Sequence, residues 1–225
     1  MEILIFPDIN SLSCKSADLV ESQINKYPDS VIGLATGSTP LGLYDELIRR
    51  NREHGLSFSK VTTFNLDEYV GISSDHPQSY RAIMDNRLFK KIDIELSNTF
   101  IPDGMAENLL VVGTDYENLI KEMGGIDLQI LGVGTDGHIG FNEPTSSLGS
   151  ITRVKTLTQK TIEDNSRFFQ PDEFQPKLAI TMGIKTILDS RRILLLAHGE
   201  NKADAVRDMV EGPLCAFCPA SALQL

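Results

Sequence analysis

The sequence contains short runs rich in apolar and β-branched residues, at positions 31–35, 61–64, 126–133 and 193–197. Runs of this kind are typical of strands that are buried on both faces of a sheet. Between them, apolar residues recur at helical spacing, as Leu43 and Leu47 do, which predicts amphipathic helices at 41–50, 80–89 and 116–123. Strands that alternate with helices pair in parallel, so the pattern predicts an α/β fold with a mostly parallel sheet.

The segments outside this alternation complete the outline. Residues 1–7, Met-Glu-Ile-Leu-Ile-Phe-Pro, form another apolar run, which we interpret as a strand. Residues 159–176 are polar and irregular, which predicts a lid over a site and not a part of the core. The 225 residues show no repeat, no low-complexity tract and no shift in composition, so we expect one domain over 1–225.

Charge and composition limit the partners of the chain. The formal net charge is -10 and the pI is about 4.9, and without a basic stripe this disfavours nucleic acid and anionic membranes as partners. No stretch reaches the ~20 apolar residues of a membrane span, and the start does not resemble a signal peptide, so we expect a soluble, cytoplasmic protein. The three cysteines, Cys14, Cys215 and Cys218, are interpreted as reduced, structural thiols.

The glycine-rich segment 132–144 carries the first candidate chemistry, because it follows the third apolar run and contains Asp136, His138 and Glu143. Open α/β sheets bind ligands beyond the carboxyl ends of their strands, where this segment is expected to lie. A histidine between two carboxylates suits proton transfer, since an acid can fix its tautomer and raise its basicity. A metal site is the alternative, although one histidine is a small ligand set. The Gly-x-Gly-x-x-Gly match at 132–137 is not a dinucleotide fingerprint, because no amphipathic helix begins there.

Residues 36–40, Thr-Gly-Ser-Thr-Pro, lie between a predicted strand and a predicted helix. Thr39 is expected to cap this helix and Pro40 to fit its first turn, while Gly37 lets the backbone approach a ligand. Free N–H groups and the positive end of the helix dipole favour a phosphate group here. An ordinary capped turn is the alternative.

The other two strand ends also carry charged residues. Asp67 and Glu68 follow the second run and are expected to point in opposite directions, so that one is a candidate base and the other makes structural hydrogen bonds. Lys202 follows the fourth run at the start of a helix, where a cation suits a bound anion, and Arg167 in the lid could act in the same way. Taken singly, each of these is otherwise a surface charge.

Four segments in this order closely resemble the glucosamine-6-phosphate deaminase family: ATGSTPLG at 35–42, FNLDEYVG at 64–71, GVGTDGHIGFNEP at 132–144 and NSRFF at 165–169. The resemblance runs almost end to end. It implies an open, Rossmann-like α/β fold with helices on both faces. It also implies an enzyme of amino-sugar catabolism that converts glucosamine 6-phosphate and water to fructose 6-phosphate and ammonia, with neither a redox cofactor nor a catalytic metal.

The resemblance further implies roles for individual residues. Asp67 matches the base that moves a proton between C2 and C1 of the sugar, and His138 matches the group that opens the pyranose ring. Asp136 and Glu143 match the acids that assist ring opening. The residues that match the phosphate binders are Gly37, Ser38, Thr39, Arg167 and Lys202.

Two departures from larger, hexameric members bear on assembly and regulation. Ser146, Arg153 and Lys155 match part of the site at which N-acetylglucosamine 6-phosphate activates those enzymes. The longer carboxyl-terminal segment that completes that site does not follow Leu225. We therefore expect a monomer or a low-order homo-oligomer without strong allosteric activation.

Two alternatives stand beside the deaminase hypothesis. A 6-phosphogluconolactonase resembles this family in fold and has a related Gly-x-Asp-Gly-His loop, but lactone hydrolysis requires neither a C2 base nor ring-opening acids. A sugar-phosphate sensor without turnover is the other alternative. Such regulators normally carry a DNA-binding domain and lose their catalytic acids, whereas this chain has no such extension and retains all four candidates.

Overall fold

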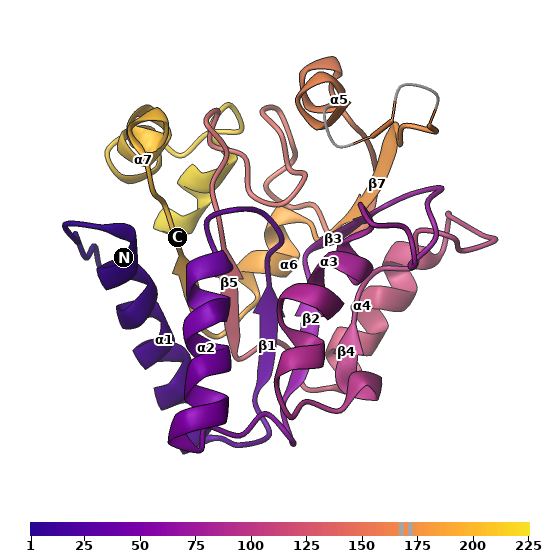
Figure 1. Ribbon diagram of the computed structural model, residues 1–225. Coiled ribbons are helices and arrows are strands. Elements are labelled where there is room, and N and C mark those ends of the chain that lie inside the picture. The colour runs from indigo at the N-terminus through magenta and orange to yellow at the C-terminus, as the bar shows by residue number, and fades with distance from the viewer. Residues whose placement is uncertain (167–168, 171–172) are drawn as a thin grey trace.

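A computed structural model of the protein describes residues 1–166, 169–170 and 173–225. Within this part of the chain, five parallel strands form a sheet in the order β4-β2-β1-β5-β8 (Figure 1). They are β1 (Val31–Leu34), β2 (Thr62–Asn65), β4 (Thr99–Phe100), β5 (Leu128–Leu131) and β8 (Ile193–Leu195). Each of the four apolar runs in the sequence therefore contains a strand, and the predicted α/β fold with a parallel sheet is confirmed.

Helices cover both faces of this sheet because the side chains of each strand alternate between the faces. Ile32 and Leu34 of β1 belong to a core cluster with the helices at Ile9–Lys26 and Leu41–His54, whereas Val31 belongs to a second cluster with the helices at Val112–Glu122 and Ala203–Val210. The helices are α1 (Ile9–Lys26), α2 (Leu41–His54), α3 (Tyr80–Arg87), α4 (Val112–Glu122), α5 (Gln159–Ser166), α6 (Ile184–Leu188) and α7 (Ala203–Val210). The shorter 3-10 helices are η1 (Phe89–Lys91), η2 (Leu96–Asn98), η3 (Glu200–Lys202) and η4 (Pro219–Gln224). Among the described residues, none of these helices combines the length and apolar character of a membrane span.

A second, antiparallel sheet adjoins the carboxyl edge of the parallel one. Its order is β3-β7-β6, with β3 (Asp67–Tyr69), β6 (Arg153–Thr156) and β7 (Leu178–Thr181). The chain passes from β2 into β3 through Leu66, whose carbonyl accepts a hydrogen bond from Met182 N at 2.7 Å. In Figure 1, β7 and α5 extend upward beyond the end of β1. The acid pair Asp67 and Glu68 thus lies where the two sheets meet.

Two predictions about the outline are wrong. Residues 1–6 form no regular secondary structure and Ile5 is 91% exposed, because no described strand lies alongside to bind this backbone. The chain instead begins its fold at α1, where Asp8 caps the helix by accepting a hydrogen bond from Ser11 N at 2.8 Å. The expected irregular stretch 159–176 also begins with a helix, α5.

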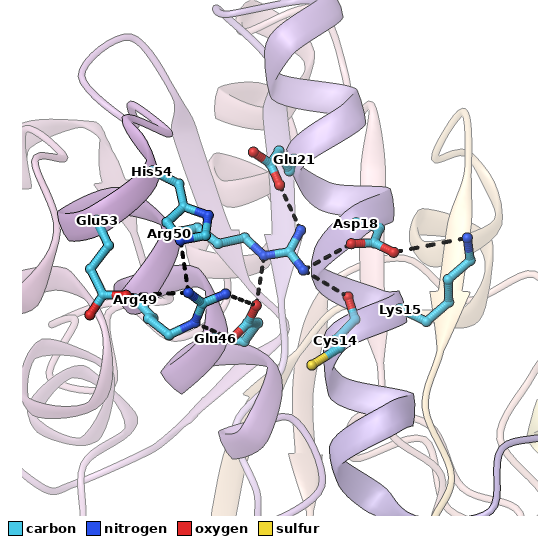
Figure 2. Close-up of polar contacts among 9 residues, drawn as sticks. All are labelled: Cys14, Lys15, Asp18, Glu21, Glu46, Arg49, Arg50, Glu53 and His54. Carbon is cyan, nitrogen blue, oxygen red and sulfur yellow. Dashed lines mark hydrogen bonds and ion pairs between the residues drawn. The ribbon is translucent and has the colours of Figure 1, made fainter.

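A network of charges around Arg50 joins α1 to α2 (Figure 2). The Arg50 guanidinium contacts the carboxylates of Asp18, Glu21 and Glu46 at 2.8, 2.6 and 2.8 Å, and donates to the carbonyl of Cys14 at 3.1 Å. The Arg50 side chain is only 9% exposed. A buried guanidinium requires such partners, because a charge taken out of water without compensation is costly.

Candidate active site

The predicted site residues follow four neighbouring strands of the parallel sheet. β2, β1, β5 and β8 are adjacent in that order, and parallel strands end at the same edge. Hydrogen bonds continue past the strand ends, from Leu66 N to Leu34 O at 3.0 Å and from Leu196 N to Leu131 O at 2.8 Å. The fold therefore brings four distant segments of the sequence to one edge, which is the edge where open α/β sheets bind ligands.

Asp67 is buried beside the segment that follows β5. Its residue is 5% exposed, and no group in the described part of the chain donates a hydrogen bond to its carboxylate. Burial raises the pKa of Asp67 to about 8, and the neighbouring Glu68 carboxylate adds to this rise. Oδ2 of Asp67 lies 3.3 Å from the place that a Cβ would occupy on Gly140, so the absence of a side chain there keeps the loop clear of the acid. A carboxylate whose conjugate acid has this pKa is a stronger base than an ordinary aspartate, and it can accept and return a proton near neutral pH.

Glu68 has a structural task. Its carboxylate accepts hydrogen bonds from the backbone N–H groups of Tyr69, Tyr80 and Arg81 at 2.8, 2.9 and 3.0 Å. Two of these donors belong to the first turn of α3, where N–H groups lack partners within the helix. The expected division of the acid pair into one free carboxylate and one structural carboxylate matches these contacts.

Asp136 and His138 form a pair at the edge of the loop after β5. Nδ1 of His138 lies 2.6 Å from Oδ1 of Asp136, and the backbone N–H of His138 donates to the same oxygen at 3.2 Å. The hydrogen bond to His138 lowers the pKa of Asp136 to about 2, so Asp136 remains an acceptor and directs the ring proton to Nδ1. Nε2 is then free to exchange a proton with a ligand. The side chains of His138 and Asp136 are 38% and 35% exposed, which allows access from solvent.

Glu143 is buried at 5% exposure and bound by residues that precede or belong to α5. Its Oε1 accepts hydrogen bonds from the hydroxyl groups of Thr158 at 2.8 Å and Thr161 at 2.5 Å, and from the Thr158 N–H at 3.4 Å. These two threonines were not predicted as site residues. A Thr-x-x-Thr pattern before a helical segment is a capping signal, but its connection to Glu143 is not visible in the sequence.

The loop between β1 and α2 contains the predicted phosphate binders Gly37, Ser38 and Thr39. Gly37 has a φ of 119°, which favours glycine. In the described part of the chain, no group accepts a hydrogen bond from the backbone N–H of these three residues, so all three remain available to an anion. The prediction that Thr39 caps α2 is wrong, because Pro40 occupies the N-cap and no side chain caps the helix. The uncapped start leaves the positive end of the helix dipole open to a ligand.

Lys202 ends η3 and directly precedes α7, as predicted for a cation at the start of a helix. Burial lowers the pKa of Lys202, and the carboxylate of Asp136 acts in the opposite direction. No ion pair joins Lys202 to any carboxylate that the structure describes. Arg167, the remaining predicted phosphate binder, lies outside the described residues, as does part of the predicted lid.

Cavities and clusters of metal-binding side chains give no additional candidate in the described part of the chain. One cavity of about 430 Å³ is lined by Phe100, Asp115 and Tyr116 among others. Another of about 410 Å³ reaches the acid pair only through Glu68. Neither cavity is lined by Asp67, Asp136, His138 or Glu143. No three described His, Cys, Asp or Glu side chains are arranged to hold a metal ion.

The sequence is similar to proteins of known activity. Residues 9–225 match the protein family described as glucosamine-6-phosphate isomerases/6-phosphogluconolactonase. A glucosamine-6-phosphate deaminase of Cellvibrio japonicus (strain Ueda107) is 57% identical over 225 residues, which are 100% of this chain and 86% of that protein. Its counterpart in Arthrobacter sp. (strain FB24) is 49% identical over the same shares of both chains.

Solved structures show the same relationship. A monomeric glucosamine-6-phosphate deaminase of the NagB superfamily superposes with a TM-score of 0.96 at 47% identity, over 100% of this chain and 93% of that one. The 6-phosphogluconolactonase from Thermotoga maritima superposes with a TM-score of 0.74 at 18% identity, over 98% of this chain and 92% of that one. The second likeness shows a shared fold alone.

Proposed function

The chain belongs to the family of glucosamine-6-phosphate isomerases and 6-phosphogluconolactonases, and we propose that within this family it acts as a glucosamine-6-phosphate deaminase. It converts glucosamine 6-phosphate and water to fructose 6-phosphate and ammonia. The observation that carries the proposal is the Asp67 carboxyl group, which is buried, has no described hydrogen-bond donor and lies beside Gly140 in the loop that also holds Asp136 and His138. Such a group suits the transfer of a proton between C2 and C1 of a sugar. Hydrolysis of a lactone needs no such transfer.

Asp67 is the proposed catalytic base. In the open-chain sugar, which carries its amine as ammonium, the Asp67 carboxylate removes the proton from C2. A double bond forms between C1 and C2, and O1 takes up a proton from the ammonium group, which gives an enolamine with the proton from C2 held on the acid. The acid returns this proton to C1, which leaves a protonated imine at C2. Water adds to that carbon and ammonia departs, so that the ketose carbonyl forms at C2 and the atoms balance.

Ring opening precedes this step and is assigned to the loop after β5. Nε2 of His138 accepts the proton of the O1 hydroxyl and donates it to the ring oxygen as the C1–O5 bond breaks, so that the imidazole ends the step neutral. Asp136 supports the charge that develops on the imidazole, because its carboxylate accepts from Nδ1. Glu143 is the second acid proposed to assist the opening.

The substrate phosphate is placed at the start of α2. The N–H groups of Gly37, Ser38 and Thr39 supply donors in this proposal, and the ammonium of Lys202 supplies charge. The absence of an ion pair between Lys202 and the described carboxylates supports this assignment, because the cation has no competing partner there. Arg167 is proposed as a further cation on the basis of the family resemblance.

The test is to supply the purified protein with glucosamine 6-phosphate and to measure ammonium and fructose 6-phosphate in parallel, with 6-phosphogluconolactone as the control substrate. Equal amounts of ammonium and ketose are expected, with no lactone hydrolysis above the spontaneous rate. Hydrolysis of the lactone without release of ammonium would transfer the assignment to the lactonase. Tight binding of the amino sugar without turnover would favour a sensor.

The assembly state is part of the proposal. We infer a monomer, on the strength of the similarity to a deaminase described as monomeric. Ser146, Arg153 and Lys155 match only part of the activator site of larger enzymes. We therefore expect no strong allosteric activation and a hyperbolic velocity curve. Light scattering during size exclusion measures the mass, and a sigmoidal curve that N-acetylglucosamine 6-phosphate makes hyperbolic would contradict the absence of activation.

A further inference from the structure

The first turn of α5 and the Glu143 carboxylate form one hydrogen-bonded unit. All three donors to Glu143 bind the same oxygen, Oε1, and they come from Thr158 and Thr161. The residues are separated by 15 and 18 positions along the chain, so the contact depends on the tertiary fold. No described group donates to the other oxygen, Oε2. Within the described part of the chain, one oxygen of the carboxylate is therefore bound by α5 and the residue before it, and the other has no donor.

Thr158 also caps α5. Its Oγ1 accepts a hydrogen bond from the N–H of Thr161 at 3.2 Å, as expected of an N-cap residue, while its hydroxyl group donates a hydrogen bond to Glu143. The two hydroxyl oxygens lie 3.0 Å apart. The same atoms thus begin the helix and orient the carboxylate, so a change in one affects the other. The positive end of the α5 dipole adds to the attraction for the anion.

From this geometry we propose that Thr158 and Thr161 are positioning residues for the reaction. They bind Oε1 of Glu143, so that Oε2 is the oxygen that acts during ring opening. Because the same hydroxyl groups belong to the start of α5, the orientation of the carboxylate and the stability of the first turn of α5 depend on each other. The proposal rests on the proposed function for its effect on turnover, but not for the link between Glu143 and α5. In this proposal both threonines act through Glu143 and not on the substrate.

The activity test removes one hydroxyl at a time. Thr161→Val keeps the volume of the side chain and removes the donor, and kcat for glucosamine 6-phosphate is expected to fall about 10- to 100-fold, as when a hydrogen bond to a charged group is lost. KM is expected to change less than about threefold. Thr161→Ser restores the donor and is expected to recover kcat to within about threefold of the wild type.

Thr114→Val on the exposed face of α4 is the matched control, and its kcat is expected to equal that of the wild type. An unchanged kcat in Thr161→Val would overturn the positioning role. So would an equal loss in Thr161→Val and Thr161→Ser, because that pattern indicates a requirement for the shape of threonine and not for its hydroxyl group.

A second measurement does not depend on activity. Glu143→Met removes the acceptor while keeping a similar volume, and amide hydrogen exchange in 159–166 is expected to become faster than in the wild type, with exchange in α4 unchanged. Unchanged exchange in 159–166 would overturn the link between the acid and the helix. If the wild-type protein releases no ammonium, the proposed function fails, and this exchange experiment still decides the link.

Discussion

Arg50 and Asp67 are both buried ionisable residues, but their surroundings have opposite effects on the charged form of the side chain. Arg50 contacts three carboxylates between α1 and α2, and although burial acts to lower the pKa of this guanidinium, its hydrogen bonds to Glu46, Asp18 and Glu21 raise it overall (Figure 2). Asp67 has no donor among the described residues, and burial raises its pKa to about 8. The first arrangement favours the charged form and the second favours the neutral form.

The same contrast separates the two cations of these regions. Arg50 has its positive charge matched within the protein, whereas Lys202 has no ion pair with a described carboxylate and its pKa is lowered by burial. A paired charge stabilises the fold and has little capacity left for a ligand. An unpaired charge at the carboxyl edge costs stability but is available for binding or proton transfer. This difference indicates which of the two regions is built for chemistry.

The largest expected effect is on turnover. Asp67→Asn keeps the shape of the side chain and removes the base, so kcat for ammonium release should fall by about 10²–10⁴-fold. Substrate binding should persist, because the phosphate contacts are elsewhere. Calorimetric titration with the substrate and a coupled ammonium assay measure both quantities. Near-normal ammonium release would remove Asp67 from the role of base.

The pH dependence of stability provides a sharper test of the same residue. Because the folded pKa of Asp67 is raised from 3.8 to about 8, the folded state binds the extra proton between these values, and stability is lost as pH rises through this window. Asp67→Asn should remove this loss, so the variant should gain stability relative to the wild type by up to about 1.4 kcal/mol per pH unit. Urea unfolding at pH 5, 7 and 9 measures the difference. A difference that is constant with pH would contradict the raised pKa.

The paired region should respond in stability and not in turnover. Arg50→Met removes the guanidinium and leaves Glu46, Asp18 and Glu21 without their partner, which should lower the free energy of unfolding by about 3 kcal/mol. The carboxylates of Asp18 and Glu21 are partly exposed and become hydrated in the variant. The expected loss of unfolding free energy is therefore at the lower end of the range for a buried ion pair. At a temperature well below the unfolding transition, kcat should remain within about twofold of the wild type. A large loss of kcat in a folded variant would contradict the proposed separation of the two regions.

Lys202→Met tests the unpaired cation. Loss of one charged contact to the phosphate should raise KM for glucosamine 6-phosphate by about 10- to 100-fold with little change in kcat. Stability should not fall, because no ion pair with a described residue is broken. Initial rates over a wide range of substrate concentration separate KM from kcat. An unchanged KM, with a lowered Tm, would assign Lys202 to the structure instead of the ligand.

The smallest effect is expected at Arg49, next to Arg50. Arg49 contacts Glu46 at 2.7 Å and Glu53 at 3.2 Å, but its side chain is 42% exposed, so Arg49→Met should lower the Tm far less than Arg50→Met does, because solvent screens exposed ion pairs. This variant is the matched control for Arg50→Met, since both lose a guanidinium from the same helix. Thermal unfolding of the two variants side by side measures the difference. Equal destabilisation would show that burial does not distinguish the two residues.

Much of the fold and of the candidate site followed from local pattern. The runs at 31–35 and 126–133 predicted buried strands, because apolar side chains are required on both faces of a parallel sheet. Asp67, Asp136, His138 and Glu143 were identified by their position after such runs. The strand predicted at 1–7 failed for a tertiary reason, since an apolar run becomes a strand only where a neighbouring strand binds its backbone.

The connections of the site were beyond the reach of the sequence. Nothing local to Thr158 or Thr161 indicates that their hydroxyl groups bind Glu143, because the chain must first pass through β6. Similarly, two adjacent acidic residues differ in role. Glu68 accepts hydrogen bonds from N–H groups at the start of α3, whereas Asp67 lies beside Gly140, which has no side chain.

The sequence by itself determined the alternation of strands and helices, the kinds of side chain at each strand end, and the family to which the chain belongs. These depend on the order of residues over short stretches, which the chain carries whether or not it is folded. Only the tertiary structure decided which charges are paired, which acid is buried without a donor and which threonines orient Glu143. Those properties depend on desolvation and on contacts between distant segments, and both arise only when the chain folds.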